Sequence, residues 1–414
     1  MLKQDNDNPR KPKGRVLFAG QAYYNTWYLS RALRKLGWKA DVLNLDCGST
    51  NQIFYHGEDF GFSYRKYNVD LCRHLFFYLR SLFQYDIYHF SNKGGIMFGG
   101  YIRILVKELG LPEYSEIRLL KILGKKIVYS NNSCLDGVSQ SAFRRWPGPE
   151  PVCDSCRWRD EPLVCSDRLN LAWGKVRNEL ADFQCTMGGN RADYNDWATV
   201  HEVPEFYCLD PEVWRPDLPV PPEFQLNYPP GTIRLYHSVG NFEDRTVGNN
   251  RNIKSTHIYV PLVERLKSEG YPVEMLSFSR VPNLEVRFYQ VQADIFLDML
   301  TFGFFGATAR EAMMLGKPVI CYLRPQWLES MRREVPQYVE ELPIVTATPE
   351  TVYEVLRDLL KHPEKCQEIG RRGREFALKW HSAAAGARRL DQIYSGLLQD
   401  RVEKQNAKVT LGRL

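Results

Sequence analysis

The sequence lacks any uninterrupted apolar run long enough to cross a bilayer. Residues 1–13 are mostly polar and charged, contain prolines and lack the apolar core of a secretory signal peptide, so we expect a disordered tail there. No short-period repeat is present either. These absences argue against a membrane-spanning, exported or repeat protein. We expect a cytoplasmic protein, with peripheral contact at the inner membrane face as an option.

A strong charge of either sign is also absent. Lys and Arg number 55 against 49 Asp and Glu, a net charge of +6, and the basic residues are spread along the chain. We therefore expect no nucleic-acid partner. The mild basic excess still favours anionic substrates or an anionic membrane surface. The pairs Arg144-Arg145 and Arg388-Arg389 are candidates for such contacts, although solvated helix faces are the more ordinary explanation.

The bulk composition is that of a globular protein, with 44% hydrophobic and 25% charged residues, and 414 residues favour two domains. An apolar run at 15–20 ends in glycine and is followed by a helical pattern at 27–36 and a second apolar run at 40–45. Further runs at 85–90 and 126–130 continue the alternation. This order predicts an α/β fold with a parallel, Rossmann-like sheet.

The chain divides at changes in composition. Regular alternation stops at about 131–167, where Gly, Pro, Trp and Cys dominate, and a proline-rich linker at 216–230 precedes a second strand–helix alternation. We predict a first Rossmann-like domain at 14–216 with a Cys-rich insertion at about 131–167, a second Rossmann-like domain at 217–382, a terminal helix at 383–400 and a loose tail at 401–414.

The most informative segment spans residues 294–320. It reads Asp-Ile-Phe-Leu-Asp, then Gly-Phe-Phe-Gly-Ala-Thr-Ala-Arg-Glu from 303 to 311, then Gly-Lys-Pro-Val-Ile from 316 to 320. This pattern resembles the donor-binding stretch of glycosyltransferase family four, which consists of retaining enzymes of the GT-B fold. The resemblance covers most of the second domain. It implies two Rossmann-like domains facing across a cleft, with the helix at 383–400 packing back toward the first domain, whose cleft side would bind the acceptor.

The resemblance also implies a hexosyltransferase-like reaction. A sugar would pass, with retention of configuration, from a nucleotide-diphosphate sugar to an unidentified acceptor, which is a saccharide, a lipid-linked molecule or a small molecule. Gly306 permits close backbone approach, and the N–H groups at Ala307 and Thr308 suit a donor diphosphate. In the resembling family, the glutamate at the place of Glu311 holds the ribose. Thr308-x-x-Glu311 also fits a capping box.

One donor position departs from the family pattern. Gly303 stands where the family has a glutamate that contacts the transferred sugar. A different sugar, contacts through backbone N–H groups and weakened activity are three open explanations. We keep Gly303 among the expected donor-binding residues.

Residues 250–256 resemble the basic loop of the same family. Arg251 and Lys254 are expected to bind the donor diphosphate and to stabilise the charge that develops on the leaving nucleotide. Gly20 matches the family's glycine-rich turn in the first domain. Asn132 stands near the place of a family histidine. Its amide donates hydrogen bonds but cannot act as a base near neutral pH. Asn132 is therefore our third candidate catalytic residue, after Arg251 and Lys254, and we assign it no role as a base.

In a retaining mechanism of this kind the leaving phosphate itself receives the acceptor's proton. His89 is an alternative base, although a structural histidine is the more ordinary reading. The folded part of the chain has no convincing Asp-x-Asp, since the pattern occurs only at Asp5 and Asp7 in the tail. We therefore expect transfer without a catalytic divalent metal.

Ten cysteines in a chain without an export signal argue for metal binding over disulfides. Cys153 and Cys156 have the spacing of a metal knuckle, and Cys134 and Cys165 are near enough in sequence to complete four ligands. Such a site would be a closed structural zinc site. Free buried thiols are the alternative, because the spacing does not specify the fourth ligand.

Two other function classes stay open. Nucleotide-sugar epimerases share the GT-B architecture and the logic of donor binding, so the fold alone does not decide the chemistry. A zinc-stapled binding protein would explain the cysteines but would leave residues 306–320 unexplained. Release of free nucleotide that depends on an acceptor separates transfer from epimerisation.

Overall fold

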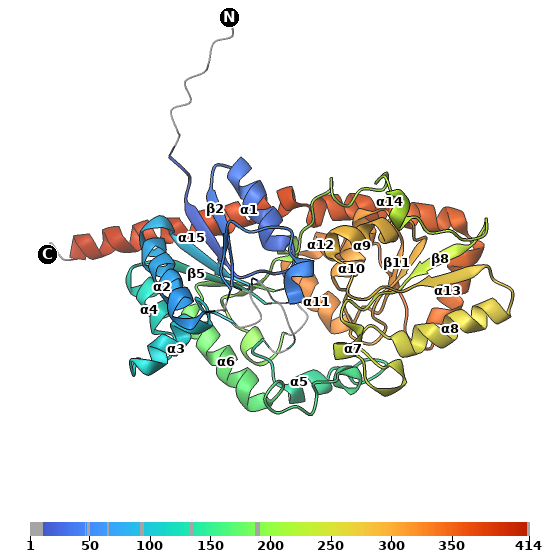
Figure 1. The fold of residues 1–414 in the computed structure, drawn as a ribbon, viewed down its shortest axis with the longest axis horizontal. Coiled ribbons are helices and arrows are strands. Elements are labelled where there is room, and N and C mark those ends of the chain that lie inside the picture. The colour runs from blue at the N-terminus through green and yellow to red at the C-terminus, as the bar shows by residue number, and fades with distance from the viewer. Residues whose placement is uncertain are drawn as a thin grey trace, which may run out of the picture.

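The computed structural model describes residues 11–411, apart from residues 46, 48, 49, 64, 65, 92–94, 132, 133, 135 and 187–190. The chain forms two α/β domains that lie side by side, each built on its own parallel sheet (Figure 1). Within the described ranges, no helix is long and apolar enough to cross a membrane. The predicted α/β class with two Rossmann-like domains is confirmed.

The first sheet has seven parallel strands in the order β3-β2-β1-β4-β5-β6-β7. Their bounds are β1 Arg15–Ala19, β2 Lys39–Asn44, β3 Phe60–Gly61, β4 Ile87–Phe90, β5 Lys126–Ser130, β6 Phe183–Thr186 and β7 Val200–Glu202. Both faces of this sheet are buried. Val16 and Phe18 pack with α1 and the last helix, while Leu17 and Ala19 pack with α2, α3 and α4, as the two-residue period of a strand requires.

The helices of this domain follow the strands in chain order. They are α1 Asn25–Lys35, α2 Tyr67–Gln84, α3 Gly100–Glu108, α4 Ser115–Ile122, α5 Gln140–Arg144 and α6 Asp167–Leu180, with short 3₁₀ turns η1 Thr50–Phe54, η2 Val152–Ser155, η3 Asp193–Asn195 and η4 Pro204–Phe206. The Cys-rich segment lies between β5 and α6, where the described residues form α5, η2 and irregular backbone.

The second sheet has five parallel strands in the order β12-β11-β10-β8-β9. Their bounds are β8 Ile233–Tyr236, β9 Val273–Leu276, β10 Ile295–Leu297, β11 Val319–Cys321 and β12 Val345–Thr346. Its helices are α7 Phe242–Arg245, α8 Thr256–Ser268, α9 Asn283–Gln290, α10 Ala307–Met314, α11 Pro325–Glu334, α12 Pro336–Glu341, α13 Val352–Lys361 and α14 Pro363–Trp380, with η5 Pro222–Phe224 and η6 Gly248–Asn250.

The chain crosses between the domains twice, and the two crossings are hydrogen-bonded together. The N–H of Leu209 donates to the carbonyl of His381 at 2.7 Å, and the N–H of Ala383 donates back to Leu209 at 2.8 Å. Helix α15, Ala383–Leu411, then packs on α1 of the first domain (Figure 1). It continues to Leu411, past the expected end at residue 400, because Glu, Lys, Gln and Ala in this stretch are strong helix formers.

Candidate donor-binding site

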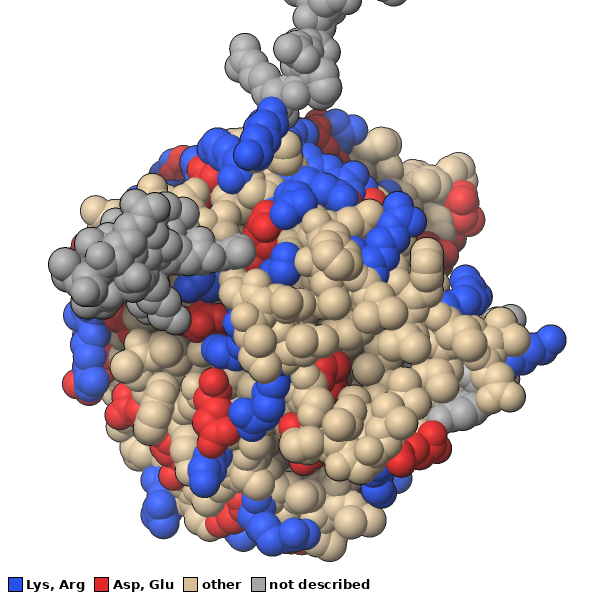
Figure 2. Space-filling view, turned by 90° about the vertical axis from the view of Figure 1, so that its left-hand side faces the viewer, with Lys and Arg blue, Asp and Glu red and all other residues tan. Residues whose placement is uncertain are grey.

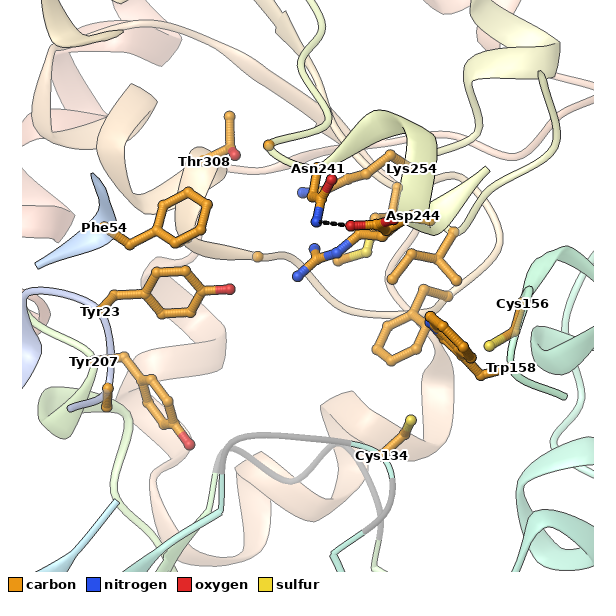
Figure 3. Close-up of a pocket in the computed structure, with 18 of the residues that line it drawn as sticks. Tyr23, Phe54, Cys134, Cys156, Trp158, Tyr207, Asn241, Asp244, Lys254 and Thr308 are labelled. Atoms are coloured by element: carbon orange, nitrogen blue, oxygen red, sulfur yellow. Dashed lines mark hydrogen bonds between the residues drawn. The ribbon is translucent and has the colours of Figure 1, made fainter. Parts of the chain in front are cut away.

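A cavity of about 1130 Å³ lies between the two domains, with walls from both domains and from the Cys-rich segment. Figure 3 shows Tyr23, Phe54 and Tyr207 of the first domain on one side and Lys254 of the second domain on another. Gly20, which follows β1, and Met299, just after β10, line it too. The cavity therefore lies at the carboxyl ends of parallel strands, where open α/β sheets bind ligands.

Helix α10 begins at the wall of this cavity. Gly306 is its N-cap residue, and Ala307 and Thr308 form its first turn, with no side chain capping the helix. An uncapped helix start presents backbone N–H groups and the positive end of the helix dipole, which together favour an anion. A Cβ atom at Gly306 would lie 3.0 Å from Nζ of Lys254, so glycine permits this close approach.

A buried carboxylate organises this end of the cavity. Asp298, just after β10, accepts a hydrogen bond from Nζ of Lys254 at 2.5 Å and another from the N–H of Gly306 at 3.0 Å. Its side chain is only 2% exposed. Asp298 therefore fixes both the ammonium group and the loop that leads into α10. The sequence pattern did not reveal this role, although an aspartate at the carboxyl end of a buried strand was a usable signal.

Glu311 lies one turn into α10 and lines the same cavity while being only 4% exposed. Its carboxylate accepts hydrogen bonds from the hydroxyl of Tyr24 at 2.8 Å and from the side-chain amide of Gln290 at 2.6 Å. The capping-box alternative is wrong, because the N-cap is Gly306 and the helix start lacks a side-chain cap. Each carboxylate oxygen keeps lone-pair capacity for a further donor.

Six of the eight expected donor-binding residues line this one cavity. They are Gly20, Lys254, Gly306, Ala307, Thr308 and Glu311. Gly20 has a φ of +99°, a conformation that favours glycine at the turn after β1. The remaining two expected residues, Arg251 and Gly303, are not among the residues that line it.

Arg251 contacts the Cys-rich segment. Its guanidinium lies 3.6 Å from the carboxylate of Glu150, which also lies 3.9 Å from the ring of His257. The expectation that Arg251 lines the donor site beside Lys254 is therefore not met. The reason is tertiary, because Glu150 comes from a segment about 100 residues earlier in the chain.

Gly303 is placed by backbone geometry. Its φ is +99°, and a Cβ atom there would lie 2.7 Å from Cβ of Arg324, whose N–H donates to the Gly303 carbonyl at 2.8 Å. Glycine is thus required at this position by the turn and by the close approach of Arg324. This explains its presence without a donor contact.

Asn132, the candidate hydrogen-bond donor, and His89, the alternative base, differ in status. Asn132 lies outside the described residues. His89 is fully buried on β4, and its ring nitrogens bond to the hydroxyls of Tyr394 and Ser130, both at 2.6 Å. Burial lowers the pKa of His89 to about 3. It is therefore a neutral structural histidine that joins the first sheet to α15.

Two further cations, which the sequence did not single out, also line the cavity. Arg310, next to Glu311 on α10, lines it while being 7% exposed and lies over the ring of Tyr207 at 5.1 Å. Arg280, after β9, also lines it and pairs with Glu243 at 2.9 Å. The signal for Arg310 was its place beside Glu311, but a helical pattern alone does not tell which neighbour faces a cleft.

The four cysteines singled out for zinc, Cys134, Cys153, Cys156 and Cys165, all line the same cavity. Figure 3 shows Cys134 and Cys156 projecting from different segments. Burial, with the nearby thiols of Cys156, Cys165 and Cys153, raises the pKa of Cys134 to about 12. The described residues nevertheless contain no group of three or more Cys, His, Asp or Glu side chains that could hold a metal ion. The zinc site is therefore not formed as the sequence predicted it.

The fold of the chain is similar to that of several solved structures. No protein-family model and no curated protein matches the chain. Among solved structures, sucrose-phosphate synthase from Thermosynechococcus elongatus is similar at 17% identity and a TM-score of 0.53, over 94% of this chain and 100% of that one. A glycosyltransferase from Rickettsia africae is similar at 11% identity and a TM-score of 0.52, over 93% and 98% of the two chains.

A third similar structure is Anabaena HepE in complex with UDP-glucose. It has 11% identity and a TM-score of 0.52, over 92% of this chain and 100% of that one. These matches extend over both domains and nearly the full length of each compared chain. The protein therefore has the GT-B fold, the two-domain architecture of these glycosyltransferases.

Proposed function

We propose that the protein is a retaining glycosyltransferase that transfers a sugar from a nucleotide-diphosphate sugar to an acceptor. One observation carries the proposal: the start of α10, Lys254 and Glu311 line a single cavity, which Gly20 lines from the other domain. A cationic group, free helix N–H groups and a buried carboxylate are what a diphosphate attached to a ribose needs. The UDP-glucose complex of the similar Anabaena protein supports this class of donor.

Each group has a role in binding the donor. The diphosphate lies at the N–H groups of Ala307 and Thr308 and beside Lys254, which Asp298 holds in place. Arg310 supplies a second buried cation at the cavity wall. The carboxylate of Glu311 accepts hydrogen bonds from the ribose hydroxyls. These fixed charges and dipoles stabilise the negative charge that develops on the leaving nucleotide.

In the proposed transfer with retention, the leaving phosphate accepts the proton of the acceptor hydroxyl. The acceptor hydroxyl attacks on the face from which the diphosphate leaves, so a protein base is not needed. Lys254 and the helix start supply the charge stabilisation that other enzymes take from a bound cation. We accordingly propose that the chemistry needs no divalent metal.

A structural zinc ion remains part of the proposal for the Cys-rich segment. Cys134, Cys153, Cys156 and Cys165 all line the cavity. Binding of zinc would require a rearrangement that brings the four sulfur atoms together, and loss of the thiol protons. The ion would hold the irregular segment against the cavity.

Calorimetry with UDP, GDP and ADP tests the proposal, because a donor site must bind at least one nucleoside diphosphate. The partner UDP-, GDP- or ADP-sugar is then incubated with saccharide and lipid-linked acceptors, and free nucleotide is measured. We expect release that depends on the acceptor, and a product that keeps the donor's anomeric configuration. Failure of all three nucleotides to bind contradicts the proposal. Conversion of the donor sugar without any acceptor identifies an epimerase.

A further inference from the structure

The first domain has an unusual outer surface on α2, α3 and α4. Of the nineteen large hydrophobic side chains that are exposed among the described residues, ten lie between residues 69 and 123. They are Val69, Phe76, Leu79, Phe83, Ile104, Leu109, Leu111, Leu119, Ile122 and Leu123, which we call the α2–α4 face. Phe83 and Ile122 are each 80% exposed. Such a concentration of exposed apolar groups marks an interaction surface.

The exposed apolar side chains of helix α2 do not belong to the hydrophobic core of the domain. Its inward side already buries Tyr78 and Leu82 against the sheet. Its outward side carries Phe76 and Phe83, which are seven residues apart and therefore lie on one stripe. A helix that is apolar on both sides is normally covered on both sides. The outer stripe is exposed in the described chain and so needs another apolar environment.

Basic side chains outnumber acidic ones on these helices. Helices α2, α3 and α4 carry six Lys and Arg side chains, Arg73, Arg80, Arg103, Lys107, Arg118 and Lys121. They carry three acids, of which Asp70 and Glu116 are buried and Glu108 is exposed. Three of the cations pair with acids outside these helices, Arg103 with Glu113, Arg118 with Glu179 and Lys121 with Asp182. Figure 2 looks onto this end of the molecule and shows a broad uncharged area bordered by Lys and Arg, with Asp and Glu among them. Apolar tips among cations match an anionic lipid surface.

Only the start of α3 reaches the cavity, and no residue of the α2–α4 face is among those that line it. Gly99 is the N-cap residue of α3, and both Gly99 and Met97 line the cavity wall. The surface lies at α2–α4, away from the arginine pairs Arg144-Arg145 and Arg388-Arg389 that the sequence offered as candidates. Phe83 and Ile122 lie at the C-terminal ends of α2 and α4, which lead into the amino ends of β4 and β5 and are therefore at the edge of the sheet away from the cavity.

We propose that the α2–α4 face docks on an anionic bilayer, with Phe76, Phe83 and Ile122 inserted among the headgroups and the basic side chains on lipid phosphates. Docking is measured without any donor or acceptor.

Vesicle flotation tests the docking. The full chain is mixed with vesicles of phosphatidylcholine alone or with 30% phosphatidylglycerol, a composition chosen to carry about one-third anionic lipid. We expect binding to the anionic vesicles that weakens at high salt, and at least tenfold weaker binding for the double variant Phe76→Ser/Phe83→Ser. The matched control is Leu284→Ser/Leu378→Ser, which alters two exposed leucines of the second domain and should bind like the parent.

Each other outcome overturns docking. Equal binding of both double variants, equal binding to both vesicle types, or no binding would do so. A dimer in solution that only Phe76→Ser/Phe83→Ser dissociates, without vesicle binding, would assign the face to a second copy of the chain. Both variants must show the parent's far-UV spectrum, and Arg73→Glu/Arg80→Glu repeats the test through charge alone. Nucleotide calorimetry on the same samples separates a failure of docking from a failure of the proposed function.

Discussion

The hydroxyl of Tyr24, at the start of α1, donates a hydrogen bond of 2.8 Å to the carboxylate of Glu311 on α10. The two residues are 287 positions apart and belong to different domains. Both are buried, and burial, with the adjacent Glu311 carboxylate, raises the pKa of Tyr24 well above its usual value. The carboxylate expected to hold the ribose is thus also a link between the domains.

Replacing Tyr24 by Phe should weaken the link between the domains and spare the nucleotide site. A hydrogen bond to a charged group contributes about 1.5–3 kcal/mol, so we expect a lower Tm without ligand. The vacated lone pair of Glu311 is then available to a ribose hydroxyl, so the bound nucleotide should raise the Tm of Tyr24→Phe more than that of the parent. Thermal unfolding with and without nucleotide measures both effects. A variant that the nucleotide no longer stabilises would make Tyr24 a nucleotide ligand.

Substitutions of Lys254 and of Arg251 should have clearly different effects on nucleotide affinity. Lys254→Met alone leaves Asp298 as a buried charge without its cation and should destabilise the fold by about 3–5 kcal/mol. Lys254→Met/Asp298→Asn removes both charges, so we expect a folded protein with at least tenfold weaker nucleotide binding by calorimetry. Arg251→Ala is the control and should bind within twofold of the parent, because Arg251 pairs with Glu150 outside the cavity lining. A loss of affinity in Arg251→Ala as large as that in the Lys254 double variant would restore the site expected from the sequence, in which both cations bind the diphosphate.

Nucleotide affinity should be sensitive even to a conservative substitution of Glu311. Glu311→Gln keeps the shape but loses the charge that strengthens hydrogen bonds to the ribose, so nucleotide affinity should fall roughly tenfold. Gln290 provides the matched variant, since Gln290→Glu would place a second carboxylate next to Glu311 and weaken the same site through repulsion. Calorimetry on both variants, with far-UV spectra as the check on folding, decides this. Unchanged affinity in Glu311→Gln would remove Glu311 from the donor site.

Zinc content should depend on the paired cysteines. We expect about one zinc ion per chain by elemental analysis of protein purified without chelator, and loss of that zinc in Cys153→Ser/Cys156→Ser. Cys72→Ser is the control, because Cys72 lies exposed on α2, outside the cavity lining. Metal-free protein that is folded, together with no loss of stability in the double variant, would leave four free thiols as the correct account.

Stability should rise with pH through the acid range. The folded pKa of His89 is about 3, below the usual 6.5, so the unfolded chain binds the extra proton between about pH 3 and 6.5. The free energy of unfolding therefore increases across this window and is flat above it as far as His89 is concerned. Urea unfolding at several pH values should show that His89→Gln reduces this slope by up to about 1.4 kcal/mol per pH unit. Parallel curves for parent and variant would refute a neutral buried His89.

The sequence determined the class of fold and much of the candidate donor site, because both depend on local patterns. Apolar runs that alternate with helical periodicity predict parallel sheets, and the order of Gly306, Thr308 and Glu311 along one short segment places a helix start and a carboxylate one turn apart. Lys254 could be predicted because residues 250–256 resemble a basic loop of glycosyltransferase family four and lie between the first strand of the domain and α8.

Only the tertiary structure decided the contacts between distant segments. Arg251 turns to Glu150, Gly303 is required by Arg324, and Asp298 holds Lys254, and none of these pairings has a signal in local spacing. The exposed apolar stripe of α2 was equally hidden. A hydrophobic residue at helical spacing has the same sequence pattern whether it faces a core or solvent, and which face is covered depends on how the neighbouring elements pack.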